Sequence, residues 1–153
     1  MRALELKIPP PAAAVLVASA MWGISLYTPA FEMPASIRVA VAAIIALAGI
    51  GTGLAGVISF RRAETTIHPM KPESTTALVR SGIYAVSRNP MYVGLCFILV
   101  AWAVFLSSAW ALLGPPAFVL YMNRFQITPE ESVLSAKFGA GYAAYKASVP
   151  RWL

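Results

Sequence analysis

The sequence predicts an all-α integral membrane protein with four transmembrane helices and a C-terminal amphipathic helix. Of its 153 residues, 59% are hydrophobic and 12% are charged, whereas soluble domains carry about 25% charged residues. The apolar residues gather in runs long enough to cross a bilayer, and basic residues stand at the ends of those runs. A chain of this length cannot bury so much apolar surface in a water-soluble core, so we expect lipid to solvate part of it.

Residues 1–60 are expected to form the first two spans, and residues 61–153 a second functional region. The first apolar run extends from about Ala12 to Ala30, after three prolines. It is long for the core of a signal peptide and further apolar runs follow it, so we interpret it as a span. The second run extends from Ile37 to Phe60, with Arg38 near one end, where its side chain can reach the interface.

The third and fourth spans are expected within the stretch between Arg88 and Arg124, which contains no charged residue. Adjacent serines at positions 107 and 108 stand near its middle and predict a tight turn between two short helices. Pro115 and Pro116 are expected to kink the fourth span, a defect that neighbouring helices can tolerate.

An amphipathic helix is predicted from Glu130 to Lys146. Leu134, Phe138 and Tyr142 recur there at every fourth position and share one helix face. We expect this helix to lie along the membrane interface, with Trp152 as an aromatic anchor near the chain end.

The basic residues also predict the orientation, because Lys and Arg are retained on the cytoplasmic side. With four spans, only Arg38 falls on one side, and all others fall on the opposite side: Arg2, Lys7, Arg61, Arg62, Lys71, Arg80, Arg88, Arg124, Lys137, Lys146 and Arg151. Both termini and the loop from 61 to 90 should therefore face the cytoplasm. The net charge of +6 reflects topology and does not indicate nucleic-acid binding.

The few potentially reactive side chains do not form a recognisable site. One cysteine, Cys96, and one histidine, His68, provide too few soft ligands for a metal site, and we expect no metal. We interpret Cys96 as a small apolar residue within the third span. His68 is a candidate for catalysis only because of its position in the 61 to 90 loop.

Residues 51–56 match the dinucleotide-binding pattern GxGxxG, but we reject that interpretation because the pattern lies inside a predicted membrane helix. Gly49 and Gly53 stand one turn apart and predict the close approach of a second helix. That helix could belong to the same chain or to a second copy, so the oligomeric state stays open.

Two clusters have both a structural and a functional interpretation. Asn89 followed by Pro90 predicts a helix N-cap, and Thr128 with Glu131 predicts a capping box. Functionally, the first helix start beside Arg88 could receive a ligand carboxylate. Glu130, which capping does not need, could bind the amine or ribose of a nucleotide-like ligand. On spacing alone, the structural interpretation is the simpler one at both places.

The stretch from Thr76 to Arg151 resembles the isoprenylcysteine carboxyl methyltransferase and phospholipid methyltransferase superfamily of integral membrane enzymes. The ordered set of matching residues is Leu78-Val79, Ser81-Gly82, Tyr84, Arg88-Asn89-Pro90, Tyr92, Gly94, Glu130-Glu131, Phe138-Gly139, Tyr142, Tyr145 and Val149-Pro150-Arg151. It covers about half of the chain.

The resemblance implies a methyltransferase with a pocket for S-adenosylmethionine on the cytoplasmic side, built without a Rossmann fold. The residues it implies for the cofactor are Thr76, Ala77, Leu78, Val79, Tyr84, Asn89, Pro90, Met91, Tyr92 and Glu130. Catalytic roles are implied for Glu130, Tyr92 and Arg88. The acceptor would be a lipophilic or small molecule with a prenylcysteine-like carboxylate, a lipid amine or a thiol.

Two positions depart from the family pattern. Asn89 replaces the histidine of the eukaryotic enzymes; asparagine can still donate and accept hydrogen bonds but cannot change charge near neutral pH. Gln126 replaces an arginine thought to hold the acceptor carboxylate, which argues against a prenylcysteine acceptor. We expect Arg124, which is nearby, to point elsewhere.

Methyl transfer from a sulfonium is an in-line displacement, so the protein mainly has to align the reactants and exclude water. An amine or thiol acceptor must also lose a proton, and Glu130 or Tyr92 is the candidate to take it. Two alternatives stay open. One is an NADPH-dependent membrane reductase of the sterol-reductase type, and the other is a non-catalytic membrane scaffold.

Overall fold

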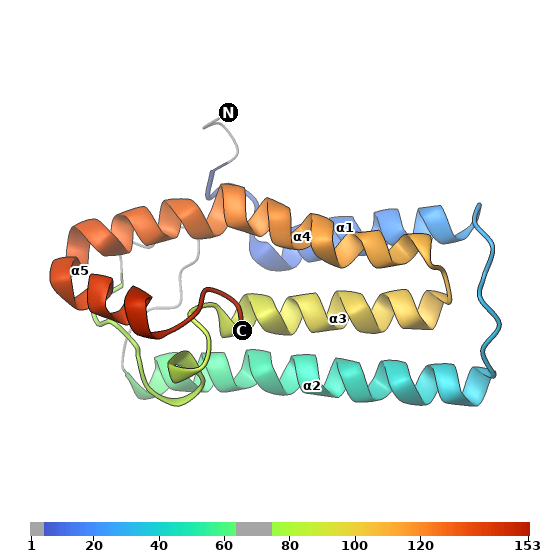
Figure 1. Ribbon diagram of the computed structural model, residues 1–153, viewed down its shortest axis with the longest axis horizontal. Helices are drawn as coiled ribbons and strands as arrows, with labels where there is room; N and C mark the ends of the chain where they lie inside the picture. The colour runs from blue at the N-terminus through green and yellow to red at the C-terminus, as the bar shows by residue number, and fades with distance from the viewer. Residues whose placement is uncertain (1–4, 64–74) are drawn as a thin grey trace.

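The computed structural model describes residues 5–63 and 75–153, and this part of the chain is helical without any strand, which confirms the all-α prediction. Arg2, His68 and Lys71 lie outside the described residues. The elements are α1 (Pro10–Ser25), α2 (Ala35–Arg62), the 3-10 turn η3 (Gly82–Ala85), α3 (Pro90–Leu106), the 3-10 turn η4 (Trp110–Leu113), α4 (Gly114–Met122), the π-helical turn η5 (Asn123–Ile127) and α5 (Thr128–Ser148). Figure 1 shows α3 lying between α2 on one side and α1 with α4 on the other.

Within the described ranges, α2 is the one helix that is both long and apolar enough to cross a membrane, with 28 residues and a mean hydropathy of 2.3 in its most apolar stretch. Only 17% of that stretch is buried, and large apolar side chains such as Ile44 and Leu47 are about two-thirds exposed. The helices α1 and α3 are also apolar but shorter. These features indicate membrane association, because lipid can solvate exposed apolar surface.

The helices α2 and α3 pack through backbone contacts at glycines. A Cβ atom on Gly94 would lie 2.6 Å from the carbonyl oxygen of Gly49, and one on Gly49 would lie 2.8 Å from that of Gly94. The predicted close approach at Gly49 is therefore confirmed within one chain. Gly53 contributes backbone atoms to this contact, but its own Cβ position has no described atom within 4 Å. The GxGxxG pattern lies inside α2, which agrees with its rejection as a nucleotide site.

The turn between α3 and η4 contains the two serines that predicted it. Ser107 has a left-handed conformation (φ 51°), and both serines are almost fully buried. The Ser107 hydroxyl accepts a hydrogen bond from Arg38 (3.2 Å), and the Ser108 hydroxyl lies 2.9 Å from that of Thr28. The turn therefore also binds the segment that connects α1 to α2. It gives Arg38 a polar partner at this end of the molecule.

The predicted kink at Pro115 and Pro116 is wrong. Both prolines stand in the first turn of α4, where the absence of an amide hydrogen costs no intrahelical bond. They begin this helix and leave its interior regular. Phe118 and Met122 of α4 pack fully buried against Met21 of α1 and Leu99 of α3 in the main core. Cys96, which is half-buried, packs against the same core.

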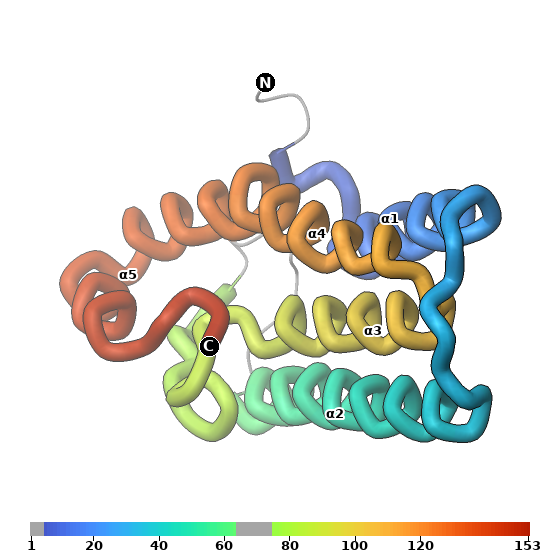
Figure 2. Tube along the Cα trace, turned by 45° about the vertical axis from the view of Figure 1, so that its right-hand side comes forward, coloured from blue at the N-terminus to red at the C-terminus, as the bar shows by residue number. Residues whose placement is uncertain are grey.

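The predicted capping box at Thr128 is also wrong, because the helix does not begin there. Helix α4 continues through η5 into α5, and the Thr128 hydroxyl donates a hydrogen bond to the carbonyl of Asn123 (2.7 Å). The amphipathic helix is likewise not one straight rod. Gly139 has φ 49° and ψ −125°, and the chain beyond it folds back over the end of the molecule (Figures 1 and 2).

The segment after α5 is held by the rest of the protein. Trp152, expected as an interface anchor, instead packs against the main core, and its indole donates a hydrogen bond to the Asn123 side chain (3.0 Å). Tyr142, Tyr145 and Val149 form a second, smaller buried cluster. The chain from Gly139 to Leu153, called the C-terminal segment below, therefore covers one end of the helical bundle.

Candidate functional site

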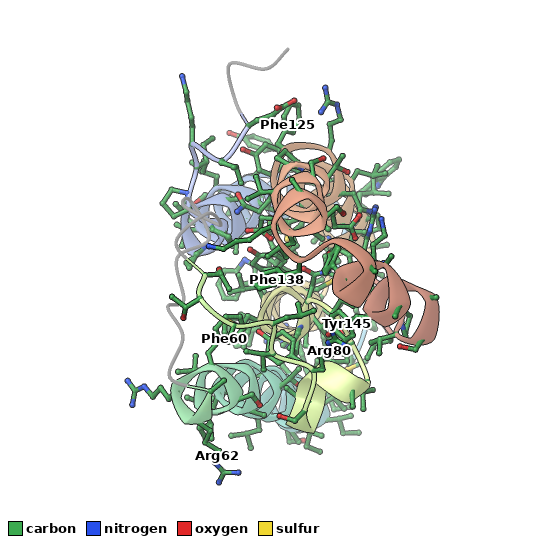
Figure 3. The ribbon with its side chains drawn as sticks, turned by 90° about the vertical axis from the view of Figure 1, so that its left-hand side faces the viewer. Phe60, Arg62, Arg80, Phe125, Phe138 and Tyr145 are labelled. Carbon is green, nitrogen blue, oxygen red and sulfur yellow. The ribbon has the colours of Figure 1, made fainter. Side chains whose placement is uncertain are left out.

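A cavity of about 410 Å³ lies at the end of the bundle that the C-terminal segment covers. This volume is within the range of pockets for small molecules. Tyr84 of η3, Asn89 and Tyr92 at the start of α3, and Glu130 of α5 all contribute to its wall. Figure 3 views the molecule from this end, with Phe60 and Tyr145 directed inward and Arg62 directed away.

Most of the residues expected to bind the cofactor line this cavity, as do all three expected catalytic residues: Ala77, Leu78, Val79, Tyr84, Arg88, Asn89, Met91, Tyr92 and Glu130. Two of the expected residues do not line it. Thr76 is exposed, and Pro90 is buried at the start of α3. Their part in cofactor binding stays a prediction.

Glu130 is the acidic group with the most unusual environment in the cavity. Its Oε1 atom accepts hydrogen bonds from the Tyr92 hydroxyl (2.7 Å) and from the Gln126 amide (2.5 Å). Gln126 and Glu130 are four residues apart and therefore share a helix face. Burial raises the pKa of Glu130 to about 7, against the opposing effect of these hydrogen bonds. Glu130 can therefore gain or lose a proton near neutral pH.

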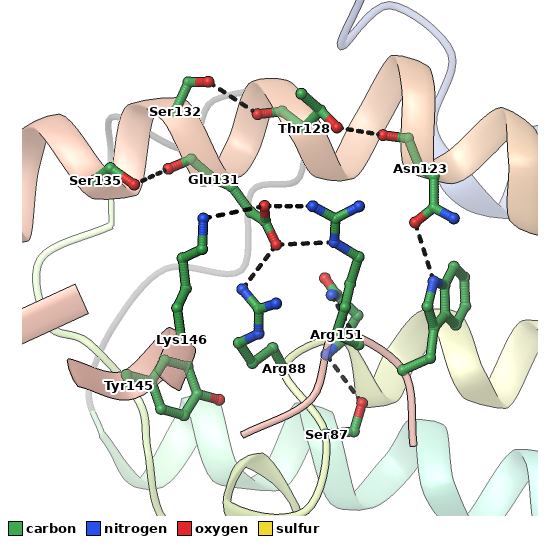
Figure 4. A network of polar contacts seen from close by, with 12 residues as sticks. Ser87, Arg88, Asn123, Thr128, Glu131, Ser132, Ser135, Tyr145, Lys146 and Arg151 are labelled. Atoms are coloured by element: carbon green, nitrogen blue, oxygen red, sulfur yellow. Dashed lines mark hydrogen bonds and ion pairs between the residues drawn. The ribbon is translucent and has the colours of Figure 1, made fainter. Parts of the chain in front are cut away.

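Glu131 is the adjacent residue, but it is the centre of a charged network (Figure 4). It binds Arg88 at 2.7 Å and Arg151 at 2.6 and 3.0 Å, and Lys146 lies 3.7 Å away. Burial acts to raise the pKa of Glu131, but the hydrogen bond from Arg151 and the charges of Arg88, Arg151 and Lys146 outweigh it and lower the pKa. Glu131 is therefore ionised and structural, whereas Glu130 is available for chemistry.

Three further hydrogen bonds fix the chain end over the cavity. The backbone amide of Arg88 donates to the Pro150 carbonyl (3.0 Å), and the Asn89 side chain donates to the Arg151 carbonyl (2.9 Å). The Tyr145 hydroxyl donates to the Tyr84 carbonyl (2.7 Å). These contacts and the Glu131 network join the C-terminal segment to the start of α3 and close that side of the cavity.

The interpretation of Asn89 as a capping side chain is wrong, although its position is right. Asn89 stands at the N-cap of α3 and Pro90 in the first turn, as predicted, but the Asn89 side chain makes no cap hydrogen bond. The side-chain amide of Asn89 instead donates a hydrogen bond to the Arg151 carbonyl. The Asn89 side chain therefore holds the C-terminal segment.

Arg88 carries a buried donor that is available to a ligand. Its side chain is 10% exposed, and its Nε atom has no hydrogen-bond partner among the described residues. Buried donors are almost always paired in proteins, so an unpaired one at a cavity wall suggests a ligand acceptor. Burial also raises the pKa of Tyr84, whose phenol is therefore neutral and can donate a hydrogen bond.

Several residues of the site were not foreseen. Pro10 and Pro11 of α1, and Gly53, Val57 and Phe60 of α2, line the cavity, although neither apolar run carried a motif. Gln126, noted only as a departure from the family, holds Glu130. Arg124 does point elsewhere, as expected, and pairs with Glu5 at 3.1 Å.

Comparison with known proteins places the chain in a family. The model of the family described as phospholipid methyltransferase matches residues 37–141, from α2 to beyond the kink in α5. A segment of 63 residues is 48% identical to an uncharacterized protein of Haemophilus influenzae (strain ATCC 51907 / DSM 11121 / KW20 / Rd), and the match spans 41% of this chain and all of that protein. No solved structure matches the chain.

Proposed function

Since the chain belongs to the phospholipid methyltransferase family, we propose that it transfers a methyl group from S-adenosylmethionine to a lipophilic acceptor at the covered end of its helical bundle. The observation that supports this most directly is the cavity itself. It gathers Tyr84, Asn89, Tyr92 and Glu130 from three elements, and the resemblance implied a part in cofactor binding for the same four residues.

The residues at the cavity fit the cofactor. Its amino-acid part needs an acceptor for the ammonium group and a donor for the carboxylate, and Glu130 and the unpaired Nε of Arg88 can provide them. Neutral Tyr84 can donate a hydrogen bond to the ribose or adenine. When bound, the cofactor would supply an electrophilic methyl group on a positively charged sulfur.

Glu130 would also take the proton that an amine or thiol acceptor must lose. With a pKa of about 7, it is ionised often enough at neutral pH to act as a base. Tyr92 and Gln126 hold the carboxylate in place through hydrogen bonds to Oε1. Arg88 stays paired with Glu131 through Nη1, while its Nε is directed to the cofactor in this proposal.

The C-terminal segment would exclude water from the reaction. Its hydrogen bonds to Arg88, Asn89 and Tyr84 close the cavity from one side, and the apolar helices close it from another. Methyl transfer is faster in such a site, because the reacting groups are aligned and water does not compete.

We further propose that four helical segments cross the inner membrane of a bacterium, with residues 61–153 forming the cofactor region on the cytoplasmic side. The basic residues of the described chain support this. Arg61, Arg62, Arg80, Arg88, Arg151 and Lys146 belong to the end of the molecule that holds the cavity, whereas Arg38 is bonded to the turn at the opposite end.

Calorimetry on the detergent-purified protein tests this function. We expect S-adenosylhomocysteine to bind, with weaker binding in Glu130→Gln and in Tyr84→Phe. Binding of NADPH instead would favour a reductase, and binding of neither would favour a scaffold. Incorporation of radiolabelled methyl groups into extracted lipids and thiols would then identify the acceptor.

A further inference from the structure

The π-helical turn η5 joins two helices whose orientations are each fixed by other contacts. In α4, Phe118 and Met122 are fully buried in the main core. In α5, Glu131 is bound by Arg88 and Arg151. A π-helical turn contains about one more residue than an α-helical turn, and one residue corresponds to about 100° of rotation about the helix axis. The turn therefore sets the direction of the α5 side chains relative to those of α4.

The Glu130 carboxylate depends on this direction. Gln126 belongs to η5 and is 2% exposed, and Glu130 follows it by four residues. The Gln126 amide and the Tyr92 hydroxyl both donate to Oε1 of Glu130. If η5 were α-helical, the side chains of α5 would turn by about 100° relative to α4, while Tyr92 on α3 would keep its place. Glu130 would then lose Tyr92 and its position in the cavity.

Pro129 explains why this turn is not α-helical. Proline has no amide hydrogen, so Pro129 cannot donate to the carbonyl of Phe125, four residues earlier, and in a regular α-helix its ring would clash with that carbonyl. The amide of Thr128 instead donates to the carbonyl of Asn123, five residues earlier, as in a π-helix. Pro129 therefore disfavours the α-helical alternative and leaves the Phe125 carbonyl without its usual helical donor.

Residues 5–9, called the N-terminal segment below, supply the missing donor. The backbone amide of Leu6 donates to the Phe125 carbonyl at 3.0 Å. Leu6 has a left-handed conformation (φ 56°), which is unfavourable for leucine and persists only where surrounding contacts hold it. Beside it, Glu5 pairs with Arg124 of the same turn at 3.1 Å. Two contacts therefore fasten the N-terminal segment to η5.

We propose that the N-terminal segment keeps η5 in its π-helical form and thereby positions the Glu130 carboxylate, with Leu6 and Pro129 as positioning residues. Pro129 removes a donor from inside the helix, and Leu6 provides one from outside it. Neither is among the described residues that line the cavity, so each acts on the site through η5. This inference rests on the proposed function for the role of Glu130, but the exchange of donors can be tested without it.

The first test is a double-mutant cycle on stability, which needs neither cofactor nor acceptor. Leu6→Pro removes the amide and cannot adopt the left-handed conformation, so we expect thermal unfolding in detergent micelles to show a fall in Tm of at least about 3 °C. In a Pro129→Ala background, the new amide at position 129 can donate to Phe125. The same Leu6→Pro change should then lower Tm by less than half as much.

Leu6→Asn is the matched control for this cycle. It keeps the backbone amide, and asparagine tolerates the left-handed conformation better than other residues with a side chain. We therefore expect its Tm to stay within about 1 °C of that of the unmodified protein. Equal losses of Tm from Leu6→Pro in the two backgrounds would overturn the inference, because the amides at positions 6 and 129 would then not serve the same carbonyl.

The second test separates positioning from stability. Alanine favours a helix more than proline does, so Pro129→Ala should not lower Tm. We nevertheless expect its affinity for S-adenosylhomocysteine to fall at least about fivefold, because Glu130 turns away. Burial of Glu130 raises its pKa, so the resulting fall in Tm between pH 4.5 and pH 8 should also shrink by at least half. Pro116→Ala, an exposed proline in the first turn of α4, should change neither property.

The outcomes separate this inference from the proposed function. If the unmodified protein does not bind S-adenosylhomocysteine, the proposed function fails, while the cycle and the pH dependence of Tm still test the positioning of Glu130. If Pro129→Ala keeps the full pH dependence of Tm, the positioning is refuted. A reduced pH dependence with unchanged affinity would support the positioning and exclude Glu130 from the contacts of the cofactor.

Discussion

Replacing Glu130 with glutamine should make the protein more stable at alkaline pH and remove a pH dependence of its folding. Burial raises the pKa of Glu130 from its ordinary value of 4.5 to about 7. A folded state with a raised carboxyl pKa binds the proton more tightly than the unfolded state does. The stability is therefore highest below about pH 4.5, falls as the pH rises toward 7, and stays low above it.

The size of this effect follows from the pKa shift. Each unit corresponds to about 1.4 kcal/mol, so the ionised carboxylate costs about 3 kcal/mol at pH 8. For a chain of this length, that corresponds to a shift in Tm of about 6 to 12 °C. Glutamine has nearly the same shape and can still accept hydrogen bonds from Tyr92 and Gln126, but it does not ionise. The variant should match the unmodified protein near pH 4.5 and exceed it by this amount at pH 8.

Thermal unfolding in detergent micelles, followed by tryptophan fluorescence across this pH range, measures the difference. Glu131→Gln is the matched control, because it removes the adjacent carboxylate, whose pKa is shifted in the opposite direction. The pKa of Glu131 is lowered, so its contribution is present above about pH 4.5 and is lost as the pH falls through its lower folded value. Identical pH dependence in the unmodified protein and in Glu130→Gln would refute the assignment of a raised pKa to Glu130.

Three further changes test other parts of the site. Glu131→Gln should destabilise the protein by roughly 3 kcal/mol at neutral pH, because it leaves the buried Arg88 without its counter-ion; an unchanged Tm would show that the network is not structural. Tyr92→Phe removes a hydrogen bond that lowers the pKa of Glu130, so the midpoint of the pH profile of methyl transfer should move above about 7, and a downward move would contradict this. Gly94→Leu should separate α2 from α3 and destabilise the protein by about 1 to 3 kcal/mol or more, whereas Gly51→Leu should change stability by less than about 0.5 kcal/mol, both measured by thermal unfolding.

The residues of the site could be predicted from the sequence where they belong to an ordered motif. The motif around Arg88, Asn89 and Tyr92 and the acidic pair at 130 and 131 all contribute to the cavity wall. Their roles were less predictable. A carboxylate can cap a helix, bind arginine or take a proton, and its surroundings decide among these. Glu131, interpreted as a cap, is held by Arg88 and Arg151 because the chain folds back at Gly139.

The wrong predictions about the fold also arose where one local sequence is compatible with two conformations. Thr128 and Pro129 have the composition of a helix start, but η5 continues the preceding helix through them. A proline pair is compatible both with a kink inside a helix and with the first turn of a helix. The chain reverses at Ser107 and Ser108, so α4 begins at Gly114 and the pair Pro115 and Pro116 falls in its first turn. Neither choice can be made from local sequence, because both conformations satisfy the backbone locally.

The sequence by itself determined the helical class, the apolar character of the segments, the turn at the two serines and nine of the residues that line the cavity. These depend on composition, periodicity and local order, which a chain carries before it folds. The tertiary structure alone decided that α2 and α1 complete the cavity, that Gly53 faces open space, and that the two adjacent glutamates have pKa values shifted in opposite directions. These properties depend on the distances between segments far apart in the chain, and burial and charge take effect only when those segments meet.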